Sequence, residues 1–153
     1  MDWPRGGSRT VNERIPNRLA PSKELSERFS RQKRLGTGPE MALRRELHAR
    51  GLRYRVQHRI EGLPRRRADI VFTRRKVAVF VDGCFWHACP DHCVVPMANR
   101  EWWLWKFSTN RARDRDTDEK LIGLDWTVIR IWEHEQTRDA ADRVEMILRS
   151  LGT

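Results

Sequence analysis

The stretch at residues 77–93, VAVFVDGCFWHACPDHC, constrains the fold of this chain more than any other part of it. Its first five residues form a continuous apolar run, which predicts a buried strand. Asp82 and Gly83 follow with the chemistry of a turn, and three cysteines, two histidines and two large aromatic residues lie between them and the end of the stretch. Because the active sites of open α/β sheets lie at the carboxyl ends of strands, we expect the chemistry of this chain here.

The charge of the chain indicates a nucleic-acid partner. The 153 residues suffice for one domain with a modest core, and they carry a formal net charge of +10. Such a surface suits a polyanion, and no amphipathic apolar face accompanies the basic residues to favour a membrane. No apolar stretch is long enough to span a membrane, and the N-terminus lacks the apolar centre of a signal peptide. We therefore expect a protein of the cytoplasm or nucleoid, and a monomer because no exposed apolar seam is evident.

Helical and strand patterns alternate along the chain, which predicts an α/β fold. Residues 1–35, rich in Arg, Ser, Pro and Gly, are expected to form a flexible basic arm with at most a short helix at residues 23–31. This arm could contact phosphates or have no role. The folded domain is expected over residues 36–153. Its helices are expected at residues 37–51, 99–123 and 138–151, and its strands at residues 52–58, 68–72, 77–81 and 126–132.

Carboxylates occur at the ends of the expected elements. Asp69 lies near the entry of one strand and Asp82 at the exit of the next, and antiparallel pairing places those two ends side by side. Two such carboxylates can hold a divalent cation against a phosphodiester, although Asp69 alone could equally cap its strand. Glu40, at a helix start, has either an active-site role or a structural one, and its spacing favours the structural role. Asp114 belongs to a helix face that is either laced with ion pairs or turned to phosphate.

Five residues are candidate ligands for one four-coordinate metal site. Three cysteines within ten positions, in a chain without a secretory signal, indicate metal binding rather than disulfides, with free thiols as the alternative. A fourth ligand from a distant strand end would clamp the loop to the sheet, and loss of the metal should then loosen the loop. The candidates are Cys84, Cys89, His92, Cys93 and His134.

Three segments, DGCFWHACPDHC, NREWWLWKFSTNRARDRD and WTVIRIWEHE, together resemble the very short patch repair (Vsr) endonucleases. The resemblance extends from about Ser26 to Leu151. These proteins are DNA mismatch endonucleases with a restriction-endonuclease-like fold, which implies a single domain with a central mixed β-sheet flanked by helices and a zinc-bound loop. The resemblance also implies Mg²⁺-dependent nicking of double-stranded DNA beside T:G mismatches, which arise from 5-methylcytosine deamination. It further implies a structural Zn²⁺ and, among the partners, mismatch-repair proteins.

The resemblance assigns catalytic roles to individual residues. Asp69 matches the catalytic aspartate that holds magnesium, and the backbone carbonyl of Val81 matches a carbonyl that helps to hold it. Glu40 matches an active-site glutamate. His87 matches the histidine proposed as general base, which would deprotonate the attacking water, and Asp114 matches the aspartate that supports a histidine of the site.

Three aromatic residues match those that wedge into the base stack beside the mismatch. A mismatched step costs less to unstack, so intercalation is itself selective. The three are Phe85, Trp86 and Trp103.

The chain departs from the family pattern at Asp82, where better-known members have a histidine. Either Asp82 is an extra metal ligand or the proton-transfer arrangement differs. This departure keeps open a restriction-type endonuclease of the same fold, and a zinc-stabilised DNA-binding module without cleavage is a further alternative. Among the zinc candidates, the resemblance favours Cys84, Cys89, His92 and His134, with Cys93 as the alternative to His92.

Overall fold

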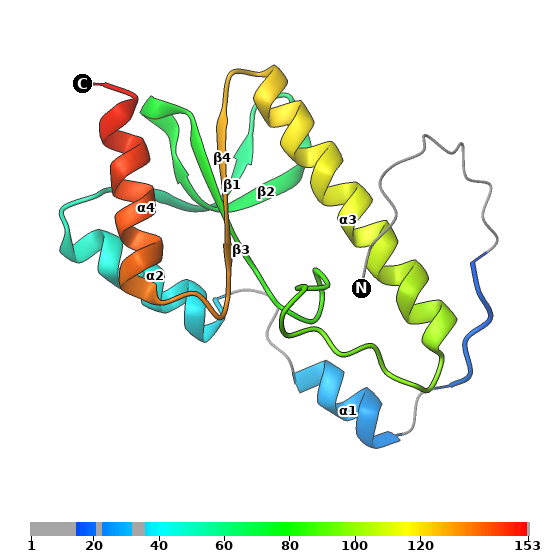
Figure 1. The fold of residues 1–153 in the computed structure, drawn as a ribbon. Coiled ribbons are helices and arrows are strands. Elements are labelled where there is room, and N and C mark those ends of the chain that lie inside the picture. The colour runs from blue at the N-terminus through cyan, green and yellow to red at the C-terminus, as the bar shows by residue number, and fades with distance from the viewer. Residues whose placement is uncertain (1–14, 21–22, 32–35, 153) are drawn as a thin grey trace.

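The computed structural model describes residues 15–20, 23–31 and 36–152, which form a four-stranded sheet with helices on both faces (Figure 1). The sheet order is β1-β2-β3-β4; β1 and β3 pair antiparallel with β2, and β4 pairs parallel with β3. The expected α/β fold with a central mixed sheet is therefore confirmed. The elements in chain order are α1 (Lys23–Arg31), α2 (Gly38–Ala49), β1 (Arg55–Ile60), β2 (Leu63–Phe72), the 3₁₀ turn η1 (Thr73–Arg75), β3 (Val77–Asp82), α3 (Arg100–Gly123), β4 (Thr127–Trp132) and α4 (Thr137–Ser150).

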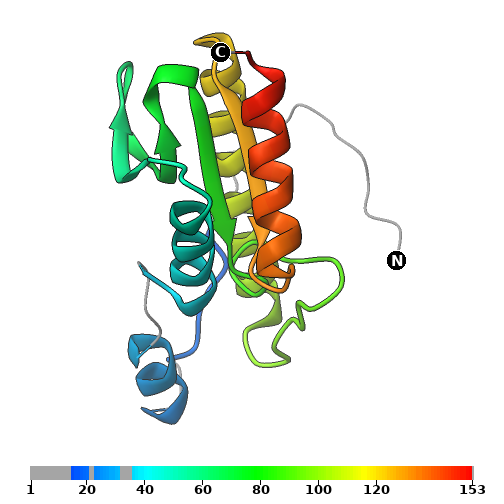
Figure 2. The ribbon, with the colours of Figure 1, turned by 90° about the vertical axis from the view of Figure 1, so that its left-hand side faces the viewer.

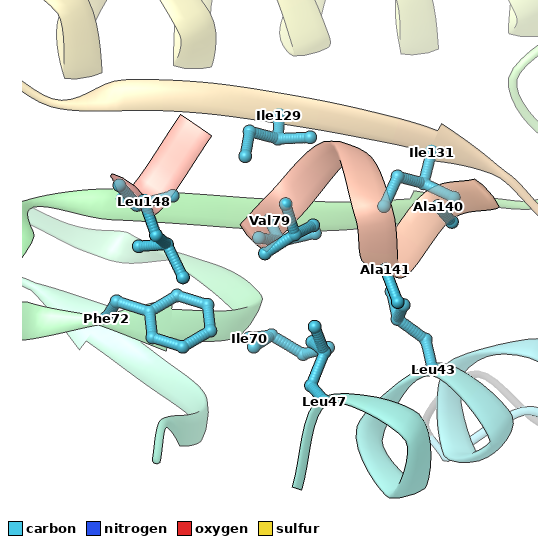
Figure 3. Packing of buried hydrophobic residues seen from close by; sticks show 12 residues of the cluster. Leu43, Leu47, Ile70, Phe72, Val79, Ile129, Ile131, Ala140, Ala141 and Leu148 are labelled. Carbon is cyan, nitrogen blue, oxygen red and sulfur yellow. The ribbon is translucent and has the colours of Figure 1, made fainter. Parts of the chain in front are cut away.

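The helices form two layers around the sheet, with α2 and α4 on one face and α3 on the other (Figures 1 and 2). Strand β3 is apolar up to its last residue, Asp82, because both of its faces are covered. One face packs against α2 and α4, as Figure 3 shows, and the other packs Ala78 and Phe80 near Leu121 of α3. Within the described residues, no helix combines the length and the apolar character that a membrane span requires.

Strand β2 starts earlier than the sequence indicates. The expected strand began at Ala68, but β2 begins at Leu63 and carries the three arginines at residues 65–67 within it. These residues are in a strand because the backbone pairs with β1, where Arg59 lies opposite Arg67. The hairpin turns at Gly62, whose φ of +87° favours glycine. Strand β1 correspondingly lies a few residues later than the expected 52–58.

The expected arm at residues 1–35 lies partly outside the described residues, which omit 1–14, 21–22 and 32–35. The short helix expected at residues 23–31 is present as α1. Residues 15–20 run beside the start of α3, where the Leu19 backbone amide donates to Asn99 Oδ1 at 2.9 Å and Asn99 Nδ2 donates to the Leu19 carbonyl at 3.1 Å. The Arg18 guanidinium lies 4.2 Å from the centre of the Trp102 ring. These contacts fix residues 15–20 against the helix that follows the 83–99 loop.

Candidate active site and metal site

Asp69 lies where strands β2 and β3 separate. The last paired residues on this side are Ile70 and Val79, and beyond them the Val81 amide donates to Asp69 Oδ2 at 2.8 Å. Gln57 Nε2 donates to Asp69 Oδ1 at 3.0 Å, so both carboxylate oxygens are held. Burial raises the pKa of Asp69; the Val81 hydrogen bond opposes this rise and the nearby Glu40 charge adds to it.

Glu40 faces the interior from the first turn of α2. Its side chain is only 3% exposed, pairs with Arg44 and accepts from the Gly36 amide at 3.0 Å. Gln57 Nε2 also lies 3.4 Å from Glu40 Oε1. The position of Glu40 is thus compatible with both roles that the sequence left open. It lies at a helix start, as a structural carboxylate would, and it shares the Gln57 hydrogen-bond donor with Asp69, as an active-site carboxylate would.

His87 belongs to a second polar group, formed by the loop after β3, α3 and β4. His87 Nδ1 donates to Asp114 Oδ2 at 2.5 Å, and its Nε2 lies 3.8 Å from Asp82 Oδ1. Burial alone would lower the pKa of His87, but the Asp114 hydrogen bond and the Asp82 charge outweigh it and raise this pKa. Burial opposes the fall in the pKa of Asp114, which the bond to His87 and the positive charges nearby nevertheless hold below its usual range. Asp114 thus orients the imidazole, as an aspartate that supports a histidine would.

Arg130 of β4 connects the carboxylates of this group. Its Nη1 lies 3.1 Å from each oxygen of Asp82, and its Nη2 donates to Asp118 at 2.7 Å. A charged group inside an apolar strand needs such partners, because an unpaired buried charge is costly. Both oxygens of Asp82 are paired with the Arg130 guanidinium, whose positive charge disfavours a metal cation at this carboxylate and favours the second alternative, a different arrangement around His87.

Asp69 of the first group and His87 and Asp114 of the second line one cleft of about 360 Å³. Its lining combines carboxylates and the histidine with arginines from β2, α3 and β4. The lining includes Asp69, Val81, Asp82, His87, Asp114, Arg65, Arg66, Arg67, Arg113 and Arg130. A basic cleft that also contains acidic groups suits a phosphodiester held next to a cation.

The loop after β3 also brings four metal-ligating side chains together. Their ligand atoms all lie within 4.8 Å of one another, and they are Cys84, Cys89, His92 and His134. Two sulfur and two imidazole donors are the chemistry of a tetrahedral structural zinc site. Burial, with Cys89 close by, raises the pKa of the Cys84 thiol to about 12, so a cation must displace its proton on binding. Cys93 lies outside the group, with its Sγ 3.8 Å from the Phe85 carbonyl oxygen.

This cluster joins the loop to the end of β4. The His134 Nδ1 atom lies 3.1 Å from Cys84 Sγ and 3.7 Å from Cys89 Sγ. The Cys84 amide also donates to Glu133 Oε1 at 2.8 Å. A metal held here would fix the segment that carries His87 relative to the sheet.

The three aromatic residues expected to enter DNA pack against one another. The Phe85 ring centre lies 5.2 Å from that of Trp86 and 5.1 Å from that of Trp103. Trp103 is 2% exposed, whereas Phe85 and Trp86 are half-buried. Phe85 and Trp86 are therefore partly accessible to solvent, and the buried Trp103 packs against both of them.

Two residues of the site were not identified from the sequence, Gln57 and Arg130. Arg130 left a signal, because it is the charged residue in the apolar run WTVIRIW. Gln57 left none, since its place opposite Asp69 follows only from the pairing register of β1 with β2.

Comparison with known proteins gives a consistent result. The family described as DNA mismatch endonuclease Vsr matches residues 20–94, which include Glu40, Asp69 and His87. The type II nicking enzyme V.NaeI of Lentzea aerocolonigenes is 44% identical over 128 residues, or 82% of this chain and 77% of that protein. The type II nicking enzyme V.HpaIIP of Haemophilus parainfluenzae is 35% identical over 120 residues, or 76% and 82%. The DNA mismatch endonuclease Vsr of Escherichia coli strain K12 is 38% identical over 100 residues, or 63% and 61%.

Proposed function

This chain belongs to the Vsr family of DNA mismatch endonucleases, and from that premise we propose that it nicks double-stranded DNA beside T:G mismatches produced by 5-methylcytosine deamination. The observation that carries the proposal is the single basic cleft into which Asp69 and the His87–Asp114 pair both open. The relatives V.NaeI and V.HpaIIP are nicking enzymes, which supports cleavage of one strand.

Magnesium fits the oxygen donors at the strand edge. Asp69 and the Val81 carbonyl would hold it, and the nearby charge of Glu40, which raises the pKa of Asp69, would favour a cation there. When bound, magnesium supplies positive charge for the phosphate and lowers the pKa of water.

The protein side chains supply orientation and proton transfer. His87 would take the proton of an attacking water, with Asp114 fixing the direction of its ring through Nδ1. Its Nε2, the nitrogen that would accept the proton, lies 3.8 Å from Asp82, which Arg130 holds by an ion pair. Phe85 and Trp86 would enter the base stack, where a mismatched step resists unstacking least.

The experiment that tests this function uses a T:G duplex incubated with the protein and Mg²⁺, with Ca²⁺, or with EDTA. We expect a nick with Mg²⁺ and bound but intact DNA with Ca²⁺ or EDTA. Cleavage in EDTA would contradict the magnesium assignment. Binding without cleavage under every condition would instead support the DNA-binding module.

The arginines of the cleft wall give a separate prediction about binding. Arg65 and Arg67 are exposed beside Asp69, and we expect them to neutralise backbone phosphates. Changing both to glutamine should weaken binding of T:G and paired duplexes alike, and should reduce the slope of log K against log salt by about 2. Arg74→Gln, at an exposed arginine in η1 outside the cleft, is the control and should reduce the slope by less than about 0.5. Equal slopes for the double variant and the parent protein would show that this wall does not face DNA.

A further inference from the structure

Gln57 has a backbone conformation that is unusual for a residue within a strand. Its φ is +47°, in the left-handed region that residues other than glycine rarely adopt. The other four described non-glycine residues with positive φ, Lys76, Ala88, Asn99 and Asp125, all lie in turns, loops or at helix ends. Gln57 alone among these five lies inside a strand, β1. Backbone strain of this kind persists where the surroundings enforce it, and it is concentrated at functional sites.

The side chain of Gln57 explains what this backbone achieves. The pairs Val56–Ile70 and His58–Ala68 flank it, so Gln57 lies opposite Asp69. Its one amide group reaches two carboxylates from different elements, at 3.0 Å from Asp69 Oδ1 and 3.4 Å from Glu40 Oε1. An amide nitrogen has two hydrogens, one for each of these acceptors.

The neutrality of the amide matters for a cation site. Arg44 already pairs with Glu40, so the negative charge that attracts a divalent cation is mainly that of Asp69. A lysine or arginine at position 57 would cancel this charge, whereas an amide orients both carboxylates and adds no charge. The Val81 amide holds the second oxygen of Asp69, so that carboxylate is fixed from two sides. Each of its oxygens retains a further lone pair for a metal.

We propose that Gln57 is a positioning residue, whose amide holds Asp69 and Glu40 as one divalent-cation site and whose strained backbone is kept for that contact. The proposal rests on the proposed function only in that the cation serves DNA cleavage. It concerns the free protein, so it can be tested without DNA.

The test measures the rise in Tm that Mg²⁺ produces in the full chain, because a ligand that binds the folded state stabilises it by mass action. The variant Gln57→Gly removes the side-chain amide, and glycine adopts a positive φ without strain. The variant Gln57→Asn keeps an amide, but its side chain is too short to reach both carboxylates. For both variants we expect a Tm without Mg²⁺ at or above that of the parent protein, and a Mg²⁺ concentration for half of the Tm rise that is increased at least about tenfold. Lys76→Gly is the matched control, since Lys76 has φ +51° in a turn away from the cleft. It should leave the Mg²⁺ dependence unchanged.

The proposal is overturned if Gln57→Gly lowers the Tm and leaves the Mg²⁺ dependence as in the parent protein, because Gln57 would then be structural. It is also overturned if Mg²⁺ does not raise the Tm of the parent protein, or if Mg²⁺ raises the Tm of Asp69→Asn by as much. A parent protein whose Mg²⁺ binding depends on both Asp69 and Gln57 but that leaves T:G duplexes intact would refute the proposed function and support this inference.

Discussion

Replacement of Asp69 by asparagine is expected to abolish nicking of a T:G duplex while leaving its binding within about threefold of the parent protein. Asparagine is nearly isosteric, and its side-chain oxygen can still accept from the Val81 amide. It lacks the charge that would hold a divalent cation, whose contribution to catalysis is several kcal/mol. The rate should therefore fall at least ~10³-fold. Single-turnover cleavage and a binding titration in Ca²⁺ measure the two effects separately.

Asp139→Asn is the matched control for this substitution. Asp139 is exposed in the first turn of α4 and far from the cleft lining, so its change should leave the cleavage rate unaltered. Cleavage by Asp69→Asn at more than a tenth of the parent rate would contradict the assignment of Asp69. The substitution removes charge repulsion from Glu40 but leaves one of the two hydrogen bonds of Asp69 unmade, so Tm should change by less than about 5 °C, and a larger fall would indicate a structural defect instead.

Cys89→Ser is expected to have the largest effect on stability. Cys89 is 2% exposed, and its sulfur lies 3.7 Å from Nδ1 of both His92 and His134. A structural zinc contributes its binding energy to folding, so loss of this ligand should cost on the order of 5 kcal/mol and lower Tm by roughly 10–20 °C. Zinc content and thermal unfolding, each with and without a strong chelator, measure the effect.

The third cysteine supplies the control for the metal site. Cys93 lies outside the four-ligand group, so Cys93→Ser should retain zinc and lose no more than about 1 kcal/mol. Loss of zinc from Cys93→Ser as well as from Cys89→Ser would move the ligand set to the alternative that the sequence left open, with Cys93 in place of His92.

The central strand and the loop after it were predictable because their determinants are local. Residues 77–81 of β3 are all apolar since helices cover both faces, and a continuous apolar run is visible in any sequence. The cysteines and His92 after it are also close in sequence, so the ligand group needed only His134, from the turn after β4, to be added. Asp69 and Asp82 were expected at the same edge because a short turn forces antiparallel pairing.

The remaining features depend on contacts that sequence patterns do not encode. The start of β2 was missed because three arginines resemble a loop, while backbone pairing with β1 keeps them in a strand. The role of Gln57 depends on register, and a register shift between Arg59 and Ile60 changes which residues face each other. The partners of Arg130 come from α3 and β3, so they are known only once the layers are assembled.

Strand-specific nicking tests the central claim most directly. A T:G duplex and the matching T:A duplex are each labelled on one strand at a time and incubated with the full chain and Mg²⁺ under single-turnover conditions. The account predicts one product, from the T strand of the T:G duplex beside the mismatch, and intact DNA in the other three samples. Equal cleavage of the T:A duplex, or cleavage of both strands, would contradict it and identify a restriction-type endonuclease of the same fold.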